Sequence, residues 1–134
     1  MFSFVRFNMA ATSILSTDAE MNAMAGENVD VNGWTDANKT AWGLQAESFL
    51  NNLTQYNFSD NYSSLNDDVK KILNEYVARY TAVSGIGYNM NGFETDPSLS
   101  RIHAEDMINI HTYRMEKIEN LLKEEKVKDF LKGA

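Results

Sequence analysis

The fold of this chain is decided by two segments, WTDANKTAWGLQAESFLNNLT at residues 34–54 and LNDDVKKILNEYVARYTAVSGI at residues 65–86. Both carry apolar side chains at steps of three and four residues, the spacing that gathers side chains on one face of a helix with 3.6 residues per turn. Neither segment shows the period-two alternation of a half-buried strand. The two segments therefore predict a helical hairpin.

Polar residues mark the starts of both predicted helices. Thr35 or Asp36 can accept a hydrogen bond from an unpaired backbone N–H of the first turn, and Asn66 and Asp67 can do the same for the second helix. The residues of the first helix expected to face the core are Trp42, Ala46, Phe49, Leu50 and Leu53. Those of the second helix are Leu65, Val69, Ile72, Leu73, Tyr76, Tyr80 and Val83.

A third long helix and a short one complete the prediction. Asp96-Pro97 starts the third, with Asp as cap and Pro at the first position, where its missing N–H costs nothing. Its apolar face consists of Ala104, Met107, Ile108, His111, Met115, Ile118 and Leu122. Near the N-terminus, Ser16-Thr17-Asp18 caps a short helix over residues 19–25 that Gly26 ends. We therefore expect an all-α bundle of three long helices plus a short N-terminal one.

The expected organisation is one domain with two extensions. Residues 1–15 form an extended arm, residues 16–122 the bundle, and residues 123–134 a C-terminal docking tail. Gly85 and Gly87 fit two interpretations: they end the second helix, or they let another element approach closely. The loop at residues 55–64, QYNFSDNYSS, is rich in residues whose side chains hydrogen-bond to nearby backbone groups.

Composition excludes several classes of protein. The chain has 134 residues, enough for one domain that buries roughly two thirds of its unfolded surface. With no cysteine it has no disulfide or thiolate chemistry, and a net charge of −7 argues against binding to duplex nucleic acid. No apolar run approaches the ~20 residues of a membrane-spanning helix. Arg6 and Asn8 interrupt the only signal-like stretch.

The titratable residues predict no catalytic, metal or cofactor site. His103 and His111 are eight residues apart, about 12 Å along a helix, too far to share a metal ion. His111 lies on the apolar face, where a hydrogen-bonded core histidine is the favoured interpretation over a catalytic base, and His103 is expected at the surface. Arg79 interrupts the second apolar face; it is interpreted either as half of a buried intersubunit ion pair or, in preference, as a surface arginine with a buried stem.

Apolar residues outside the three helical faces predict partner contacts. Burying apolar surface stabilises by about 25 cal/mol per Å², and a patch left exposed lacks this stabilisation, so such patches usually mark interfaces. The predicted partner-interface residues are Phe2, Phe4 and Phe7 of the arm, Tyr56, Phe58 and Tyr62 of the loop, Arg79, and Val127, Phe130 and Leu131 of the tail. The pattern points to assembly rather than to an active site.

The sequence AESFLNNLT at residues 46–54, followed by the Leu-led helix at residues 65–82 with its Ala78-Arg79-Tyr80, resembles the helical head-to-tail adaptor (connector or neck) proteins of tailed bacteriophages. The resemblance covers about half of the chain. It implies a homo-oligomeric ring, commonly of twelve copies, that lies between the portal protein and a neck or tail protein and lets DNA pass without specific binding.

The resemblance also implies a docking site on the C-terminal tail and a location. The edge formed by Val127, Phe130 and Leu131 would dock on the portal, and the protein, made in the host cytoplasm, would reside in the neck of the virion without contact to a membrane. The alternative from the residues alone is a small helical protein-binding or regulatory module. An enzyme would need a reactive constellation that the sequence does not show.

Overall fold

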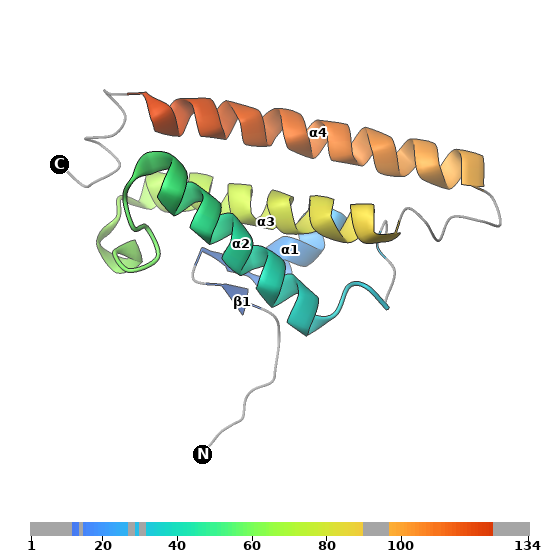
Figure 1. Ribbon diagram of the computed structural model, residues 1–134, viewed down its shortest axis with the longest axis horizontal. Helices are drawn as coiled ribbons and strands as arrows, with labels where there is room; N and C mark the ends of the chain where they lie inside the picture. The colour runs from blue at the N-terminus through green and yellow to red at the C-terminus, as the bar shows by residue number, and fades with distance from the viewer. Residues whose placement is uncertain (1–11, 14, 27–28, 30–31, 90–96, 125–134) are drawn as a thin grey trace, which may run out of the picture.

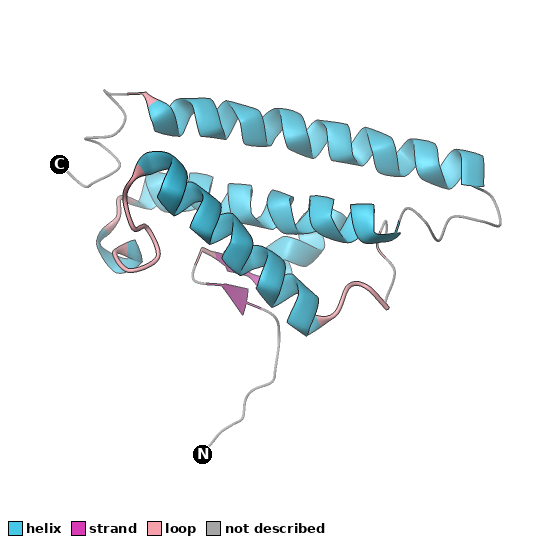
Figure 2. Cartoon of the chain, in the orientation of Figure 1, coloured by secondary structure: helices cyan, strands magenta, loops and turns pink. Residues whose placement is uncertain are grey.

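The computed structural model describes residues 12–13, 15–26, 29, 32–89 and 97–124. Its four α-helices are α1 (Asp18–Ala25), α2 (Asp36–Thr54), α3 (Asp67–Asn89) and α4 (Pro97–Lys123). A 3-10 turn, η2 (Tyr62–Ser64), lies between α2 and α3, and two-residue strands β1 (Thr12–Ser13) and β2 (Ser16–Thr17) pair antiparallel before α1. The predicted all-α class is confirmed (Figures 1 and 2).

Helix α3 occupies the centre of the bundle. It contacts α1, α2 and α4, while α4 lies along its length and α2 crosses it (Figure 1). The small hairpin of β1 and β2 packs on α2 and α3. Leu15, in the turn of this hairpin, is fully buried, so the core begins before residue 16, where the sequence had placed the boundary between arm and bundle.

The helix starts follow the sequence signals. Thr17 and Glu20 form a capping box at α1: Glu20 N donates to Thr17 Oγ1 (3.3 Å) and Thr17 N donates to Glu20 Oε1 (2.8 Å). Thr35 caps α2 by accepting from the N–H of Asn38 (3.1 Å). At α3, Asn66 Oδ1 accepts from Asp68 N (3.0 Å). Each cap satisfies a backbone donor that the helix itself cannot.

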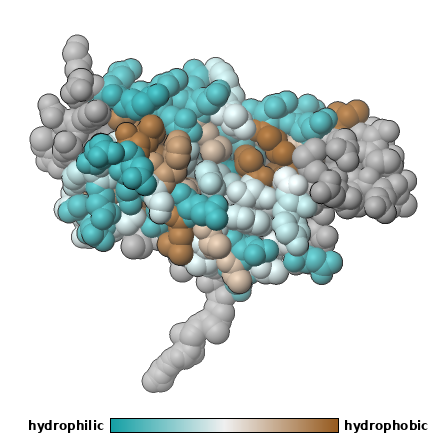
Figure 3. Space-filling view, in the orientation of Figure 1, coloured by the Kyte–Doolittle hydropathy of each residue, from teal (hydrophilic) through white to brown (hydrophobic). Residues whose placement is uncertain are grey.

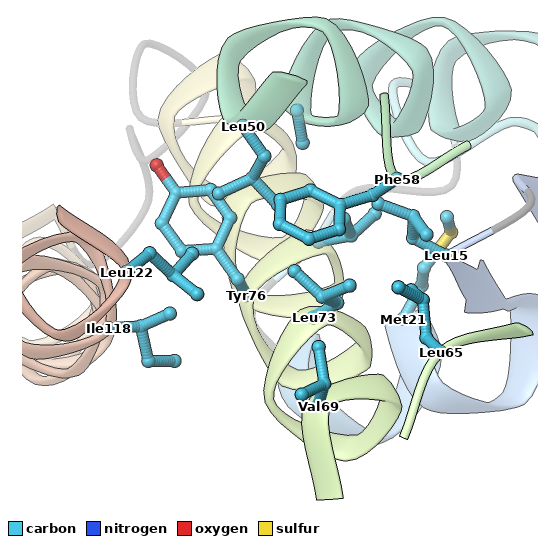
Figure 4. Close-up of a cluster of buried hydrophobic side chains, with 12 residues drawn as sticks. Leu15, Met21, Leu50, Phe58, Leu65, Val69, Leu73, Tyr76, Ile118 and Leu122 are labelled. Atoms are coloured by element: carbon cyan, nitrogen blue, oxygen red, sulfur yellow. The ribbon is translucent and has the colours of Figure 1, made fainter. Parts of the chain in front are cut away.

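The core lies where α3 faces its neighbours (Figure 4). Its members are Leu15, Met21, Ala46, Leu50, Phe58, Leu65, Val69, Leu73, Tyr76, Val77, Ile118 and Leu122. Tyr76 is the largest fully buried side chain among the described residues, and its hydroxyl donates to Glu119 Oε2 of α4 (2.7 Å). Burial, with Glu119 adding to it, raises the pKa of Tyr76 far above the ordinary value of a phenol. The ring is therefore an uncharged link between α3 and α4.

The buried face of α2 differs from the predicted one. Ala46 and Leu50 are buried as expected, but Trp42 and Leu53 are half-buried and Phe49 is 42% exposed, with its ring stacked on Tyr76 at 6.3 Å. The buried positions of α2 are Lys39, Gly43, Ala46, Glu47, Leu50 and Thr54. The face is rotated because α1 supplies polar partners to Lys39, and the hairpin and the loop after α2 supply them to Glu47, so that both charged side chains can be buried.

The loop after α2 contributes to the core. Phe58 is 0% exposed, its N–H donates to Asn51 Oδ1 (2.9 Å), and Tyr56 meets its ring edge-on at 5.2 Å. The prediction that Phe58 is free to contact a partner is therefore wrong. Tyr62 is half-buried and donates its hydroxyl hydrogen to Asn74 of α3 (3.0 Å).

The glycine pair of α3 lies inside the helix, so the interpretation as a helix end is wrong. A Cβ on Gly85 would approach the ring of Trp34 to 2.4 Å, and one on Gly87 would meet nothing within 4 Å. Gly85 thus admits a close neighbour, and that neighbour is a tryptophan ring rather than another helix. The predicted face of α4 is confirmed: Ala104, His111, Ile118 and Leu122 are buried, and Met107, Ile108 and Met115 are half-buried.

Gly85→Ala should destabilise the fold by about 1–3 kcal/mol, because the added methyl group overlaps the Trp34 ring. Gly87→Ala, two residues further along the same helix, should instead stabilise it by about 0.5–1 kcal/mol, because Ala is the better helix former and has open space. Urea unfolding followed by far-UV circular dichroism measures both. Equal effects of the two substitutions would show that Trp34 does not pack on Gly85.

Phe58→Ala should cost about 3–5 kcal/mol of unfolding free energy, because it opens a cavity in the core. Phe49→Ala is the matched control: it removes the same ring from a half-open site and should cost about 0.5–1.5 kcal/mol, the range of an aromatic stacking contact. Thermal and chemical unfolding of the two variants compare these values. A larger loss for Phe49→Ala would contradict the assignment of the buried face of α2.

Candidate functional site

An ion network joins α3 to α4. Arg114 of α4 donates from Nε and Nη2 to the two carboxylate oxygens of Glu75 (2.9 and 3.0 Å), and Arg79 Nε donates to Glu75 Oε2 (2.7 Å). The two guanidinium groups, Arg114 first, hold the pKa of Glu75 below its ordinary value. Arg79 is thus paired within the chain and largely buried rather than a surface arginine, and its contact with another subunit stays a prediction.

His111 extends this network to α1. It is buried; Arg79 Nη1 lies 2.9 Å from Nδ1, and the carbonyl oxygen of Met24 lies 3.0 Å from Nε2. Because a guanidinium can only donate and a carbonyl can only accept, Nδ1 accepts and Nε2 carries the hydrogen. Burial lowers the pKa of His111, and the charge of Arg79 lowers it further. The predicted hydrogen-bonded core histidine is confirmed, and His103 is exposed as expected.

A pocket of about 360 Å³ lies beside the network, with walls from α1, α3 and α4. Its charged lining comprises Glu20, Lys71, Glu75, Arg79 and Arg114. The Glu75 carboxylate already accepts hydrogen bonds from both arginines, and both ring nitrogens of His111 are hydrogen-bonded. The network therefore joins three helices, and the imidazole of His111 has no free lone pair with which to take up a proton. Over the described ranges, no three His, Cys, Asp or Glu side chains are grouped to hold a metal ion.

A buried lysine connects α2 to α1. Lys39 Nζ lies 2.7 Å from Asp18 Oδ1, 3.3 Å from Asn22 Oδ1 and 5.2 Å from the centre of the Trp34 ring. The indole N–H of Trp34 donates to the same Asn22 oxygen (2.7 Å). A buried ammonium group is tolerated only with such partners. The junction positions α1, and no sequence motif had singled it out.

Glu47 makes a second buried connection. Its Oε1 accepts from Ser59 Oγ (2.8 Å) and its Oε2 lies 3.3 Å from the N–H of Leu15. One carboxylate thus joins the N-terminal hairpin and the loop after α2 to the middle of α2. The sequence does contain a signal for this burial. Glu47 lies four residues after Gly43 and three before Leu50, a spacing that places the glutamate on the same side of the helix as these buried residues.

Helix α4 carries a second apolar face, turned away from the core. It consists of Ile102, Ile110, Tyr113 and Leu121, which are 53%, 57%, 59% and 37% exposed. Asp106 and Lys117 lie between them, so that residues at steps of four, four, three, four and four form one line, called here the outer stripe. The buried residues of α4 occupy the opposite side, and sequence reasoning missed the stripe because it assigned only one apolar face to this helix.

A band of partly exposed aromatic rings follows the junction of α2 and α3. Trp42 lies 6.2 Å from Trp34 and 6.3 Å from Tyr88, whose side chain is exposed, and Phe49 lies two turns along α2 from Trp42. Tyr80 lies 6.5 Å from Tyr76, the ring on which Phe49 stacks, and we call Trp34, Trp42, Phe49, Tyr80 and Tyr88 the aromatic band. On the face shown in Figure 3, hydrophobic side chains form separate patches between polar ones rather than one continuous surface.

The predicted interface residues have different outcomes. Phe2, Phe4, Phe7, Val127, Phe130 and Leu131 lie outside the described residues. Phe58 and Arg79 are engaged within the chain. Tyr56 and Tyr62 are half-buried against the core, and a contact of their exposed edges with a partner stays a prediction.

None of the helices in the described part of the chain is both long and apolar enough to cross a membrane. Comparison with protein-family models, with curated proteins and with solved structures finds no match.

The His111 environment predicts a pH dependence of stability. The fold favours the neutral imidazole, while the unfolded chain takes up a proton near pH 6.5, so stability is complete above about pH 6.5 and declines as the pH falls through the lowered pKa of the folded state. The loss is at most about 1.4 kcal/mol per pH unit. Urea unfolding at several pH values between 7.5 and 5 should show it.

His111→Gln should flatten this decline, because the amide can accept from Arg79 and donate to Met24 without titrating. His103→Gln is the control and should keep the wild-type slope, since His103 is exposed. Identical slopes for wild type and His111→Gln would contradict the neutral, Nε2-protonated assignment.

Proposed function

We propose that this protein is a structural assembly subunit, the head-to-tail adaptor of a tailed bacteriophage. The resemblance of residues 46–54 and 65–82 to that family supports the proposal. The described polar clusters support it as well, because Lys39, Glu47 and His111 form hydrogen bonds between elements of the fold and act as structural connections.

The observation that carries the proposal is the second apolar face of α4. Only one side of α4 packs on the bundle, yet four large apolar side chains lie on the other. Apolar surface that stays in water lacks the stabilisation of about 25 cal/mol per Å² that burial would give. These four exposed side chains therefore add nothing to the stability of a monomer, which depends on its own core. A protein that is covered by other subunits gains from every one of these residues.

A ring also requires a second, different surface. Cyclic assemblies use a heterologous contact, in which one patch of a subunit meets a different patch of the next. The aromatic band offers such a patch on the α2 and α3 side of the molecule. The net charge of −7 suits a channel through which DNA passes, because it provides few cations to hold phosphates.

Removing residues 125–134 tests the proposed docking of the tail on the portal. The truncated chain should keep the helical circular-dichroism signal of α1 to α4, because the last of these helices, α4, ends at Lys123, but it should lose attachment to portal rings. Native mass spectrometry and negative-stain imaging of the chain mixed with the portal protein from the same genome measure attachment.

A control variant and a contradicting outcome make the result decisive. A variant with Val127, Phe130 and Leu131 replaced by Ser keeps the length of the tail and should fail to attach in the same way. A full-length chain that never joins a ring or a portal, and remains a stable monomer bound to some other soluble protein, would instead indicate the small protein-binding module.

A further inference from the structure

The outer stripe of α4 reads the same from both ends. Its six positions, 102, 106, 110, 113, 117 and 121, are separated by four, four, three, four and four residues. The residue types follow the same pattern. An apolar residue lies at each end, an apolar pair lies in the centre, and the two positions between carry opposite charges, Asp106 and Lys117. The line covers twenty residues, 102–121, and about 28 Å of helix.

We propose that the outer stripe binds the outer stripe of a second copy of this chain, with the two α4 helices antiparallel. A twofold axis between positions 111 and 112 would place Ile102 against Leu121 of the other copy. It would place Ile110 against Tyr113 of the other copy. The same surface then serves on both subunits, as a twofold interface requires.

Charge selects this orientation. In the antiparallel pair, Asp106 faces Lys117 of the second copy, and the same pair recurs on the other side of the axis. In a parallel pair in register, each charge would face its own copy, and like charges opposite each other oppose association. Lys117 already lies over the Tyr113 ring at 5.0 Å, so its cationic end is held beside the stripe.

The central spacing supports a helix-to-helix seam. Positions 106, 110, 113 and 117 follow the four-three-four steps of a heptad seam, in which side chains of one helix fit between those of another. The seam is short, and contacts of less than about 1,200 Å² are typical of weak or transient association. We therefore expect a dimer that forms at micromolar concentrations and dissociates on dilution.

This proposal does not rest on the proposed function, because it concerns only two copies of the purified chain. A twofold contact closes on itself and cannot extend into a ring. While the outer stripe is paired in this way it cannot also meet the aromatic band of another subunit, so the twofold dimer and a ring that uses the outer stripe are alternative assemblies of the chain.

Sedimentation equilibrium of the full-length chain tests association. Ile110→Glu should weaken the dimer at least tenfold, because it places a charge at the seam; Thr112→Glu adds the same charge to an exposed position off the stripe and should leave the dissociation constant unchanged. Asp106→Lys and Lys117→Asp should each weaken self-association, and an equimolar mixture of these two variants should dimerise again. All four positions are exposed, and circular dichroism checks that each variant remains folded.

Cross-linking tests the orientation, since the chain has no cysteine of its own. A mixture of Ile102→Cys and Leu121→Cys chains should form a disulfide-linked dimer under mild oxidation, whereas Ile102→Cys alone should not. Efficient cross-linking of Ile102→Cys with itself would indicate a parallel pair and overturn the proposal. A chain that stays monomeric at hundreds of micromolar, or a dimer that Ile110→Glu does not weaken, would also overturn it.

Discussion

Helix α3 buries side chains toward α1, α2 and α4, and the position of each of these helices depends on packing against it. Tyr76 is the residue on which this arrangement centres. Its ring is buried between α2 and α4, Phe49 stacks on it, and its hydroxyl reaches Glu119. A single aromatic side chain therefore contributes apolar area to the core and a directed hydrogen bond to α4, which fixes the rotation of α4 about its own axis.

Polar connections specify the arrangement that apolar packing alone would leave loose. Lys39, Glu47 and His111 each join segments distant in the sequence, and each would be costly if left unpaired in the interior. The Glu75 carboxylate, shared by Arg79 and Arg114, adds the same kind of constraint near the surface. Because α4 is held in this way, its outer stripe faces away from the bundle and is available to a neighbour.

Much of the fold follows from sequence pattern, and the exceptions have physical causes. The starts of α1, α2 and α3 and the core face of α4 follow from caps and periodicity. The face of α2 did not, because hydrophobicity ranks Phe49 above Glu47, whereas the structure buries the glutamate that finds two donors. Likewise Phe58 looks like a surplus loop residue until the loop folds back onto the core. Such contacts depend on partners that are distant in the sequence, so no short stretch of sequence can predict them.

The two tryptophans occupy the same end of the molecule. Trp34 and Trp42 lie 6.2 Å apart, beside Gly85 and Tyr88, and far along α2 from the end at which Tyr76 meets Glu119. Their emission consequently monitors the junction of α2 with the last turns of α3. A departure of the C-terminal half of α4 would pass unnoticed in tryptophan emission while changing the signal of an extrinsic dye placed there, so an optical study of this chain needs a second chromophore.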